Sequence, residues 1–246
     1  MSRWRYPRIV AHRGGGSFAP ENTLAALRFG AALGFKGVEF DVMLSGDGTP
    51  VLIHDETLER TTGVSGEVAR TPYAELARLD AGAWLGERWR GERIPSFEQA
   101  ARVCRELGLW ANVEIKPAAG HERATGEAAA RLAAELWRGA ELPPLLSSFS
   151  REALDAARSA APGLPRGCLV EDVPADWLAR VREFDCVSLH CDHRSLTQPL
   201  ARGIHAAGCA ILCWTVNDPR VARELLSWGA DCLVTDALDV ITAAFV

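Results

Sequence analysis

"GVEFDVMLSGDGTPVLIHD" occupies residues 37–55 and combines two apolar runs of strand length with side chains that a hydrophobic core does not accommodate. Glu39, Asp41 and His54 interrupt these runs. The turn sequence SGDG at 45–48 predicts that the strand containing the two carboxylates continues into a hairpin. Because residues two apart on a strand point to the same face, Glu39 and Asp41 are expected to project together.

Similar apolar, β-branched runs recur along the chain, and helical patterns separate them. The strand-length runs lie at 8–12, 38–42, 109–116, 145–149, 166–171, 185–190, 209–216 and 231–236. The helical patterns lie at 20–35, 96–108, 123–139, 151–160, 175–183, 197–207, 218–229 and 237–245. An eightfold alternation within 246 residues predicts parallel βαβ units that form an α/β TIM (β/α)8 barrel. A doubly wound open sheet is the structural alternative.

Several of the helical patterns carry signals for where the helix begins and ends. Pro20 stands where the first helix can begin. Ser96 and Gln99 have the spacing of a capping box. Asp218 is placed as a helix cap, with Gly229 just past the last apolar position of the same helix.

The chain shows no linker, and we expect a single barrel domain over 1–246. One interval is too long for its single predicted helix, which indicates a small insertion after the second strand at about 56–93. Because insertions after barrel strands lie at the active-site end, this one is expected to influence substrate choice. It contains Trp84 and Trp89.

Composition restricts the classes of partner. The formal net charge is −5 and the basic residues are scattered, which argues against nucleic acid and against a basic membrane-binding patch. No window approaches the 18–20 apolar residues, roughly, of a spanning helix, and no apolar run of signal-peptide length begins the sequence. With seven cysteines inside apolar runs, we expect buried, reduced thiols and a cytoplasmic location. Oligomeric state is left open.

The segment "NVEIK" at 112–116 repeats the pattern of alternate charged residues, because Glu114 and Lys116 share one face of a strand. The second and third strands of a barrel are neighbours, so Glu114 is expected to converge with Glu39 and Asp41 near the C-terminal mouth, which places three carboxylates together. Three hard oxygen ligands favour one divalent cation, Mg²⁺ or Ca²⁺, over zinc.

A metal-free ion-pair network with Arg13 and Lys116 is the alternative explanation for these carboxylates. Burying so many charges costs several kcal/mol per ion unless the geometry is excellent, which favours the metal site. "LHCDH" at 189–193 offers a second possible site, for zinc. It has no companion ligand cluster, so His190 is expected to border the pocket or to be structural.

Two histidines lie at strand ends near these carboxylates. His12 and Arg13 end the first strand, and His54 follows the hairpin. Two imidazoles at an anion site can serve as general acid and general base. Arg13 offers a planar fork for phosphate oxygens and Lys116 a point charge. Gly14, Gly15 and Gly16 would allow backbone N–H groups to approach a ligand.

Taken together, these motifs resemble those of the glycerophosphodiester phosphodiesterase family. The segments that carry the resemblance are AHRGGGSFAPENTLAAL, GVEFDVMLSGDGTPVLIHDETLERTTG, ERIPSFEQA and NVEIKP, with weaker matches at LLSSFS, CWTVND and GADCLVTD. The resemblance implies a TIM barrel of the bacterial, cytoplasmic type. It implies acid/base roles for His12 and His54, phosphate binding by Arg13 and Lys116, metal binding by Glu39, Asp41 and Glu114, a pocket-lining Trp214, and support of the loop beside the site by Glu21 and Asn22.

The resemblance further implies metal-dependent hydrolysis of a small-molecule glycerophosphodiester to sn-glycerol 3-phosphate and an alcohol. One alternative is head-group hydrolysis of lysophospholipids, which would need an apolar groove walled by Trp84 and Trp89. Another is a barrel that binds phosphodiesters without catalysis, although no residue of the site is missing. The head group, the ion, the physiological pathway, the attacking group and which histidine is the acid stay open.

Overall fold

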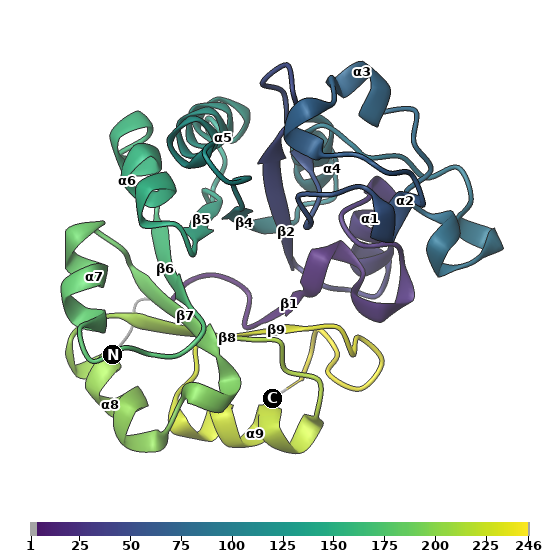
Figure 1. Ribbon diagram of the computed structural model, residues 1–246. Coiled ribbons are helices and arrows are strands. Elements are labelled where there is room, and N and C mark those ends of the chain that lie inside the picture. The colour runs from purple at the N-terminus through teal and green to yellow at the C-terminus, as the bar shows by residue number, and fades with distance from the viewer. Residues whose placement is uncertain (1–3, 246) are drawn as a thin grey trace.

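Within residues 4–245, the part of the chain that the computed structural model describes, eight parallel strands pair side by side and close into a barrel (Figure 1). They are β1 Ile9–Ala11, β2 Gly37–Leu44, β4 Trp110–Ile115, β5 Leu145–Ser148, β6 Arg166–Val170, β7 Ser188–Asp192, β8 Ala210–Trp214 and β9 Cys232–Thr235. Pairing of Ala11 on β1 with Val38 on β2 closes the cylinder. The predicted TIM barrel is confirmed, and the open sheet is excluded.

The hairpin predicted from the SGDG turn is also present. Strand β3, Pro50–Leu52, pairs antiparallel with the end of β2, and Val42 lies opposite Leu52. The hairpin returns the chain toward the barrel, so that His54 follows β3 closely and lines the same pocket as the carboxylates of β2.

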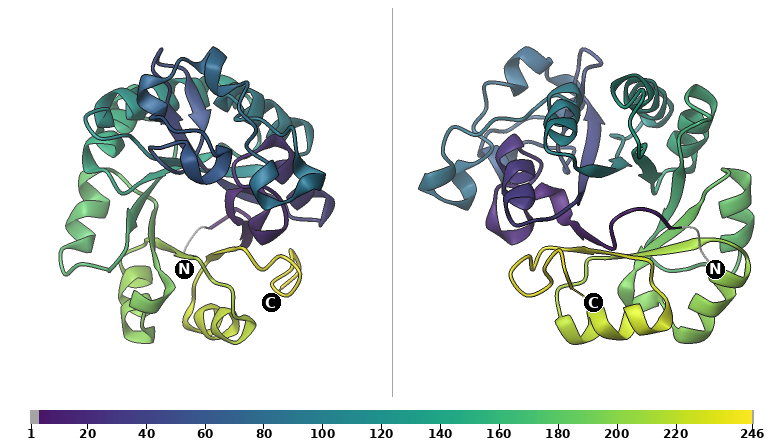
Figure 2. Two further views of the ribbon diagram at one scale, coloured as in Figure 1. Left: turned by 45° about the vertical axis from the view of Figure 1, so that its right-hand side comes forward. Right: turned by 180° about the vertical axis from the view of Figure 1, so that it is seen from behind.

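Helices surround the strands on the outside of the barrel (Figure 2). They are α1 Leu24–Ala32, α4 Phe97–Glu106, α5 Glu122–Leu136, α6 Arg151–Ala160, α7 Trp177–Glu183, α8 Gln198–Ala206 and α9 Pro219–Trp228. The Ser96–Gln99 capping box at the start of α4 is confirmed. Asp218 caps α9 and Gly229 ends it with a φ of 107°, a left-handed conformation that glycine adopts without strain.

The prediction of a helix over 237–245 is wrong. Separate turns occupy this segment, with hydrogen bonds from Val240 and Ile241 to the carbonyl of Ala237. Consecutive β-branched residues lower helix propensity. The turns also bury Leu238 and Ile241 in the core, so these apolar side chains are covered without a continuous helix.

Two element boundaries differ from those expected. The strand predicted at 185–190 lies at Ser188–Asp192, because Asp185 has a φ of 49° and breaks the extended backbone before it. Helix α1 begins at Leu24 with Thr23 as its cap rather than at Pro20. Asn22, with a φ of 58°, makes the turn between that proline and the helix.

The interior of the barrel is apolar toward the N-terminal ends of the strands. Val10, Trp110, Leu212, Cys232 and Val234 belong to one buried cluster there. The charged residues lie at the C-terminal mouth, where active sites of this fold lie, while the buried Ser188 and His190 form a polar pair inside the barrel.

The segment between β3 and α4 folds into short pieces beside α1 and α4 (Figure 1). It contains α2 Glu59–Thr62, α3 Tyr73–Leu76 and single 3-10 turns at Val68–Arg70, Ala83–Leu85 and Glu87–Trp89. Trp89 packs edge-on against Phe29 of α1, which attaches the segment to the barrel. Within residues 4–245, no helix combines the length and apolar character needed to cross a membrane.

Candidate active site

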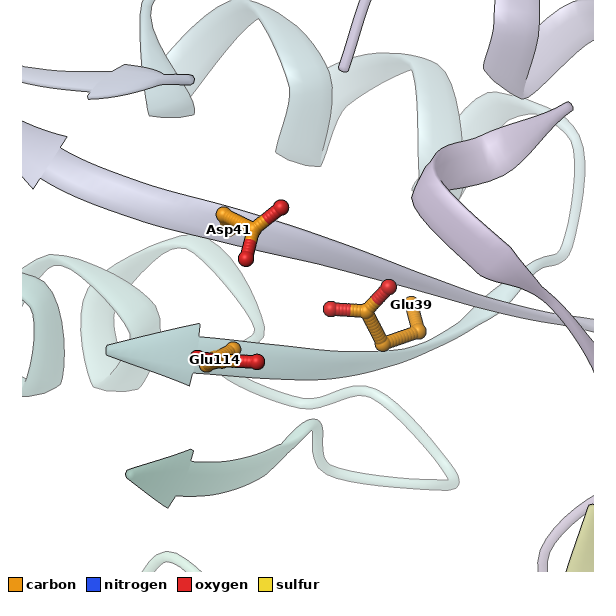
Figure 3. Close-up of side chains that lie close together, drawn as sticks. All are labelled: Glu39, Asp41 and Glu114. Atoms are coloured by element: carbon orange, nitrogen blue, oxygen red, sulfur yellow. The ribbon is translucent and has the colours of Figure 1, made fainter. Parts of the chain in front are cut away.

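The three carboxylates predicted to converge do so at the mouth of the barrel. Glu39 and Asp41 come from β2 and Glu114 from β4, and the three side chains turn toward one space (Figure 3). One ligand oxygen from each lies within 4.8 Å of the others. The strand register explains this arrangement, because Asp41 pairs directly with Glu114.

Burial and mutual repulsion make these carboxylates unusually basic. Burial, and then the charge of Asp41, raise the pKa of Glu39 to about 7 and that of Glu114 to about 8. Burial would also raise the pKa of Asp41, but the charges of Arg13, His54 and Lys116 and the hydrogen bond from Asn22 together outweigh it and lower the pKa. A divalent cation would relieve the strain that the two raised values report, so the donor set fits such an ion.

The alternative of a metal-free ion-pair network leaves this charge only partly compensated. Lys116 Nζ lies 3.3 Å from Glu114 and 3.9 Å from Asp41, and Arg13 Nε lies 3.5 Å from Asp41. Glu39, by contrast, has no lysine or arginine side chain at ion-pair distance among the described residues. Because the pKa values of Glu39 and Glu114 stay raised despite these neighbours, the network does not satisfy all three carboxylates.

Asn22 and Arg13 hold the β1–α1 loop against the acidic cluster. Asn22 Nδ2 donates to Asp41 Oδ2 at 2.8 Å, and its Oδ1 accepts from the Asp41 backbone N–H at 3.1 Å. The backbone N–H of Arg13 donates to Glu39 Oε2 at 3.1 Å, and its Nη1 donates to Glu21 at 2.7 Å. Glu21 and Asn22 therefore lie where the loop meets the site.

Gly16 allows the same loop to approach the end of β9. Its φ is 53°, and a Cβ there would lie 2.4 Å from the backbone oxygen of Asp236. The neighbouring N–H of Ser17 donates to that oxygen at 3.0 Å. The expected role of the glycines was approach to a ligand, whereas Gly16 provides approach to Asp236.

Each histidine has an aspartate at its Nδ1. The distance is 2.6 Å from His12 Nδ1 to Asp236 Oδ1, and 2.6 Å from His54 Nδ1 to Asp55 Oδ1. Burial would raise the pKa of Asp236, but the hydrogen bond with His12 and the charge of His12, together with the hydrogen bond from Asn217, keep the pKa below its usual value. The hydrogen bond from Arg60 is the main cause that lowers the pKa of Asp55 to about 2. Both aspartates are thus ionised near neutrality and each accepts a hydrogen bond from Nδ1–H, which leaves Nε2 of each ring for other partners.

The two imidazoles differ in electrostatic environment. Burial alone would lower the pKa of His12, but the hydrogen bond to Asp236 and the charge of Glu39 outweigh it and raise the value. For His54, burial prevails over the favourable charge of Asp41, and the pKa is lowered. The same residue type therefore has a shift of opposite sign at two places in one pocket.

A pocket of about 110 Å³ contains this constellation. Its lining includes all the predicted catalytic, phosphate-binding and metal-binding residues: His12, Arg13, Glu39, Asp41, His54, Glu114, Lys116 and Trp214. Phe149, 47% exposed, packs edge-on against Trp214 and carries Lys116 Nζ over its ring at 5.9 Å. One wall of the pocket is therefore aromatic.

The structure also places the remaining candidates, and His190 borders the pocket as expected. His190 lines the pocket but is completely buried in mid-strand, where its Nε2 and Ser188 Oγ lie 2.8 Å apart. His190 forms no ligand cluster with Cys191 and His193. Within residues 4–245, the three carboxylates are the only group of histidine, cysteine, aspartate or glutamate side chains close enough together to hold a metal ion. Trp84 and Trp89 are not in the pocket lining, so the apolar groove they would have walled is not found there.

Sequence reasoning missed four residues of the site: Asp55, Arg60, Phe149 and Asp236. Asp55 was visible as the immediate neighbour of His54, and Asp236 as the polar end of a strand. Arg60 gave no comparable signal, because nothing in the spacing shows which carboxylates it meets.

Comparison with known proteins adds a family to this geometry. The model of the glycerophosphoryl diester phosphodiesterase family matches residues 12–240. The chain is 32% identical to a glycerophosphodiester phosphodiesterase of Caldanaerobacter subterraneus subsp. tengcongensis over 93% of each protein. It is also 32% identical to the putative glycerophosphodiester phosphodiesterase YhdW of Bacillus subtilis, over 95% of this chain and 96% of that protein.

A solved structure resembles the chain along nearly all of its length. It is a phosphodiesterase of Oleispira antarctica in complex with its product sn-glycerol 3-phosphate, with 39% identity, a TM-score of 0.91 and coverage of 97% of this chain and 96% of that one. The structure of a glycerophosphodiester phosphodiesterase from Agrobacterium tumefaciens shares 27% identity and a TM-score of 0.79, over 97% of this chain and 99% of that one.

Proposed function

The chain belongs to the glycerophosphoryl diester phosphodiesterase family, and from this premise we propose that it hydrolyses glycerophosphodiesters to sn-glycerol 3-phosphate and an alcohol with a divalent cation and a histidine pair. The observation that carries the proposal is one pocket with three convergent carboxylates and two histidines, each oriented by an aspartate. The relatives support the substrate class, and the geometry supports the residue roles.

Glu39, Asp41 and Glu114 would hold the cation. Oxygen ligands of this kind suit Mg²⁺ or Ca²⁺. When bound, such an ion supplies positive charge to the phosphate oxygens and so reduces the repulsion that a nucleophile meets.

Arg13 and Lys116 supply the other positive charges. Arg13 Nε is buried without a hydrogen-bond partner, and the backbone and Nη1 of the same residue are held by Glu39 and Glu21. A guanidinium fixed in this way, with Nε at 3.5 Å from Asp41, presents a planar positive charge that suits phosphate oxygens. Lys116, held between Glu114, Asp41 and the ring of Phe149, adds a point charge at the same wall.

His12 and His54 would move the protons. Because Nδ1–H of each ring is bound to an ionised aspartate, Nε2 is the nitrogen that would accept or release a proton on the substrate. One ring takes a proton from the attacking group and the other gives one to the leaving oxygen, in the manner of general acid–base catalysis.

The test uses purified protein stripped with EDTA and supplied with glycerophosphocholine. We expect release of sn-glycerol 3-phosphate and choline only after Mg²⁺ or Ca²⁺ is added, and no release from an Asp41→Asn variant. Phosphocholine and glycerol as products would show that the other ester bond is cleaved. Absence of turnover with either ion in folded protein would contradict the proposal, and lysophosphatidylcholine would then be tested as the substrate.

A further inference from the structure

We propose that Arg60, on the first short helix of the segment between β3 and α4, is a positioning residue that couples Arg13 to His54. The inference rests on the proposed function, because it concerns the same pocket. Arg60 lies outside the pocket lining and does not reach the acidic cluster. Its effect would therefore pass through the two carboxylates that it binds.

The guanidinium of Arg60 joins two carboxylates from different loops. Its Nη1 and Nη2 donate to the two oxygens of Glu21 at 2.7 and 2.8 Å. Its Nε donates to Asp55 Oδ2 at 2.6 Å. Each of the three guanidinium nitrogens thus donates one hydrogen bond, in a planar, forked geometry that lysine cannot reproduce.

Each of these carboxylates in turn holds a residue of the pocket. Glu21 accepts from Arg13 Nη1 at 2.7 Å, and Asp55 lies 2.6 Å from His54 Nδ1. A continuous chain of hydrogen bonds therefore runs from Arg13 through Glu21, Arg60 and Asp55 to His54. It connects the proposed phosphate-binding residue with one of the two proposed proton carriers.

The two carboxylates of this chain are partly buried, whereas Arg60 itself is exposed. The side chains of Glu21 and Asp55 are 11% and 28% exposed, and that of Arg60 is 43% exposed. Burial would raise the pKa of Glu21, but the hydrogen bonds from Arg60 and the charge of Arg13 lower it. Two ionised carboxylates thus meet one cation, and removal of that cation leaves them to repel each other.

Loss of Arg60 should disturb both ends of the chain. Glu21 would retain Arg13 as its only cation and draw the guanidinium away from a phosphate, which raises KM. Asp55 would be free to rotate away from His54, which releases the imidazole from its Nδ1–H tautomer and lowers kcat. Displacement of positioning partners beside a reacting centre typically lowers activity about 10- to 100-fold.

Arg90 provides a matched control from the same segment. Its Nε and Nη2 bind both oxygens of Glu87 at 2.6 Å, so the local pairing is also forked. The pair is exposed, and neither partner lines the pocket. An Arg90→Gln change therefore removes a similar ion pair without touching the site.

The experiment compares the wild type with Arg60→Gln, Arg60→Lys and Arg90→Gln. It measures kcat and KM for glycerophosphocholine with Mg²⁺, the thermal midpoint, and the tautomer of His54 by ¹⁵N NMR, assigned with His54→Ala. We expect kcat/KM of Arg60→Gln to fall about 10- to 100-fold with a mixed His54 tautomer. Arg60→Lys should be impaired to a smaller extent, and Arg90→Gln should stay within about twofold of the wild type.

Three outcomes would overturn the inference. One is an Arg60→Gln variant with unchanged kcat, KM and His54 tautomer. Another is failure of both Arg60 variants to fold, which would assign the residue to stability alone. The third is equal losses in Arg60→Gln and Arg90→Gln. Inactivity of the wild type would instead count against the proposed function, and the His54 tautomer would still decide whether Arg60 positions that ring.

Discussion

Asp236 Oδ1 lies 2.6 Å from His12 Nδ1 although the two residues are 224 positions apart in the chain. His54 obtains the same support from its immediate neighbour Asp55, at the same distance. What lies behind each aspartate differs, because Asn217 donates to Asp236 whereas Arg60 donates to Asp55. A neutral partner and a cationic partner thus stand behind two otherwise similar pairs.

Asp236→Asn should reduce kcat on the order of 10²- to 10⁴-fold, in the range known for a catalytic histidine that loses its carboxylate. Asn217 Nδ2 donates to Asp236 Oδ2, so an asparagine at 236 would turn its carbonyl toward Asn217 and its NH₂ toward His12. The NH₂ group can only donate a hydrogen bond, so Nδ1 would have to accept it with its lone pair. The ring proton of His12 would then lie on Nε2 instead of Nδ1. Steady-state kinetics would measure the loss, with the exposed Asp239→Asn as control; a decrease smaller than threefold would contradict this account.

His12→Ala and His54→Ala should each remove most turnover, about 10²- to 10⁴-fold, because each deletes a proposed proton carrier. The carboxylates would stay in place, so Mg²⁺ binding measured by calorimetry should be retained in both variants. His121→Ala, at an exposed position, is the matched control. Near-normal turnover in both active-site variants would rule out the acid/base assignment.

The metal-free protein should lose stability as pH rises from about 6.5 to 8. The folded-state pKa values of Glu39 and Glu114 are raised to about 7 and about 8. A carboxyl group whose pKa is raised on folding contributes its full stabilisation at pH values below its pKa in the unfolded protein. That stabilisation is lost as pH rises through its pKa in the folded protein. His190 changes the stability in the opposite direction, because burial lowers its pKa to about 3 and the protein therefore becomes more stable as pH rises. This gain is complete above the ordinary pKa of 6.5, so it does not affect the range from 6.5 to 8.

Loss of about one bound proton over this range corresponds to about 2 kcal/mol, or roughly 5 °C in thermal midpoint. Thermal unfolding in EDTA at several pH values would measure it, with Glu114→Gln expected to flatten the profile. Added Mg²⁺ should restore the midpoint most strongly at pH 8, because the ion binds the deprotonated carboxylates. A thermal midpoint that increases between pH 6.5 and 8 without metal would show that the pKa values of Glu39 and Glu114 are not raised.

Gly167→Ala should destabilise the fold by about 1–3 kcal/mol through overpacking in the barrel interior. A Cβ at this position would lie 2.3 Å from Nε2 of the completely buried His190. Thermal unfolding should show a midpoint lower by several degrees. At Gly163, where a Cβ would meet nothing within 4 Å, the same change to alanine should be nearly neutral. Equal midpoints for the two variants would show that His190 has room to move.

The sequence alone was sufficient for the barrel and for the acidic cluster. Strand-length apolar runs and capped helices are local properties, so their alternation indicated the architecture. The spacing of Glu39 and Asp41 on one strand, and of Glu114 on the next, specified one face and one end of a parallel sheet. The structure brings these three together, because strand period and neighbour order leave little freedom.

The local pattern failed where tertiary contacts decided the outcome. The segment 237–245 carries residues with apolar spacing, but its turns bury Leu238 and Ile241 against the core instead of forming a helix. The sequence pattern predicts that a strand ends at His190, but β7 spans Ser188–Asp192, so His190 lies in mid-strand within the barrel. Boundaries of this kind depend on packing partners that lie far away in the chain.

What the sequence determined by itself is therefore the class of chemistry: hard oxygen ligands, imidazoles and cations at strand ends of a barrel. Only the tertiary structure decided which carboxylate meets which base. Barrel closure brings Asp236, just after the last strand, to His12, just after the first, and the segment after β3 brings Arg60 to Glu21. The physical reason is that backbone periodicity acts over a few residues, whereas a hydrogen bond of 2.6 Å requires two loops to be placed together by the whole fold.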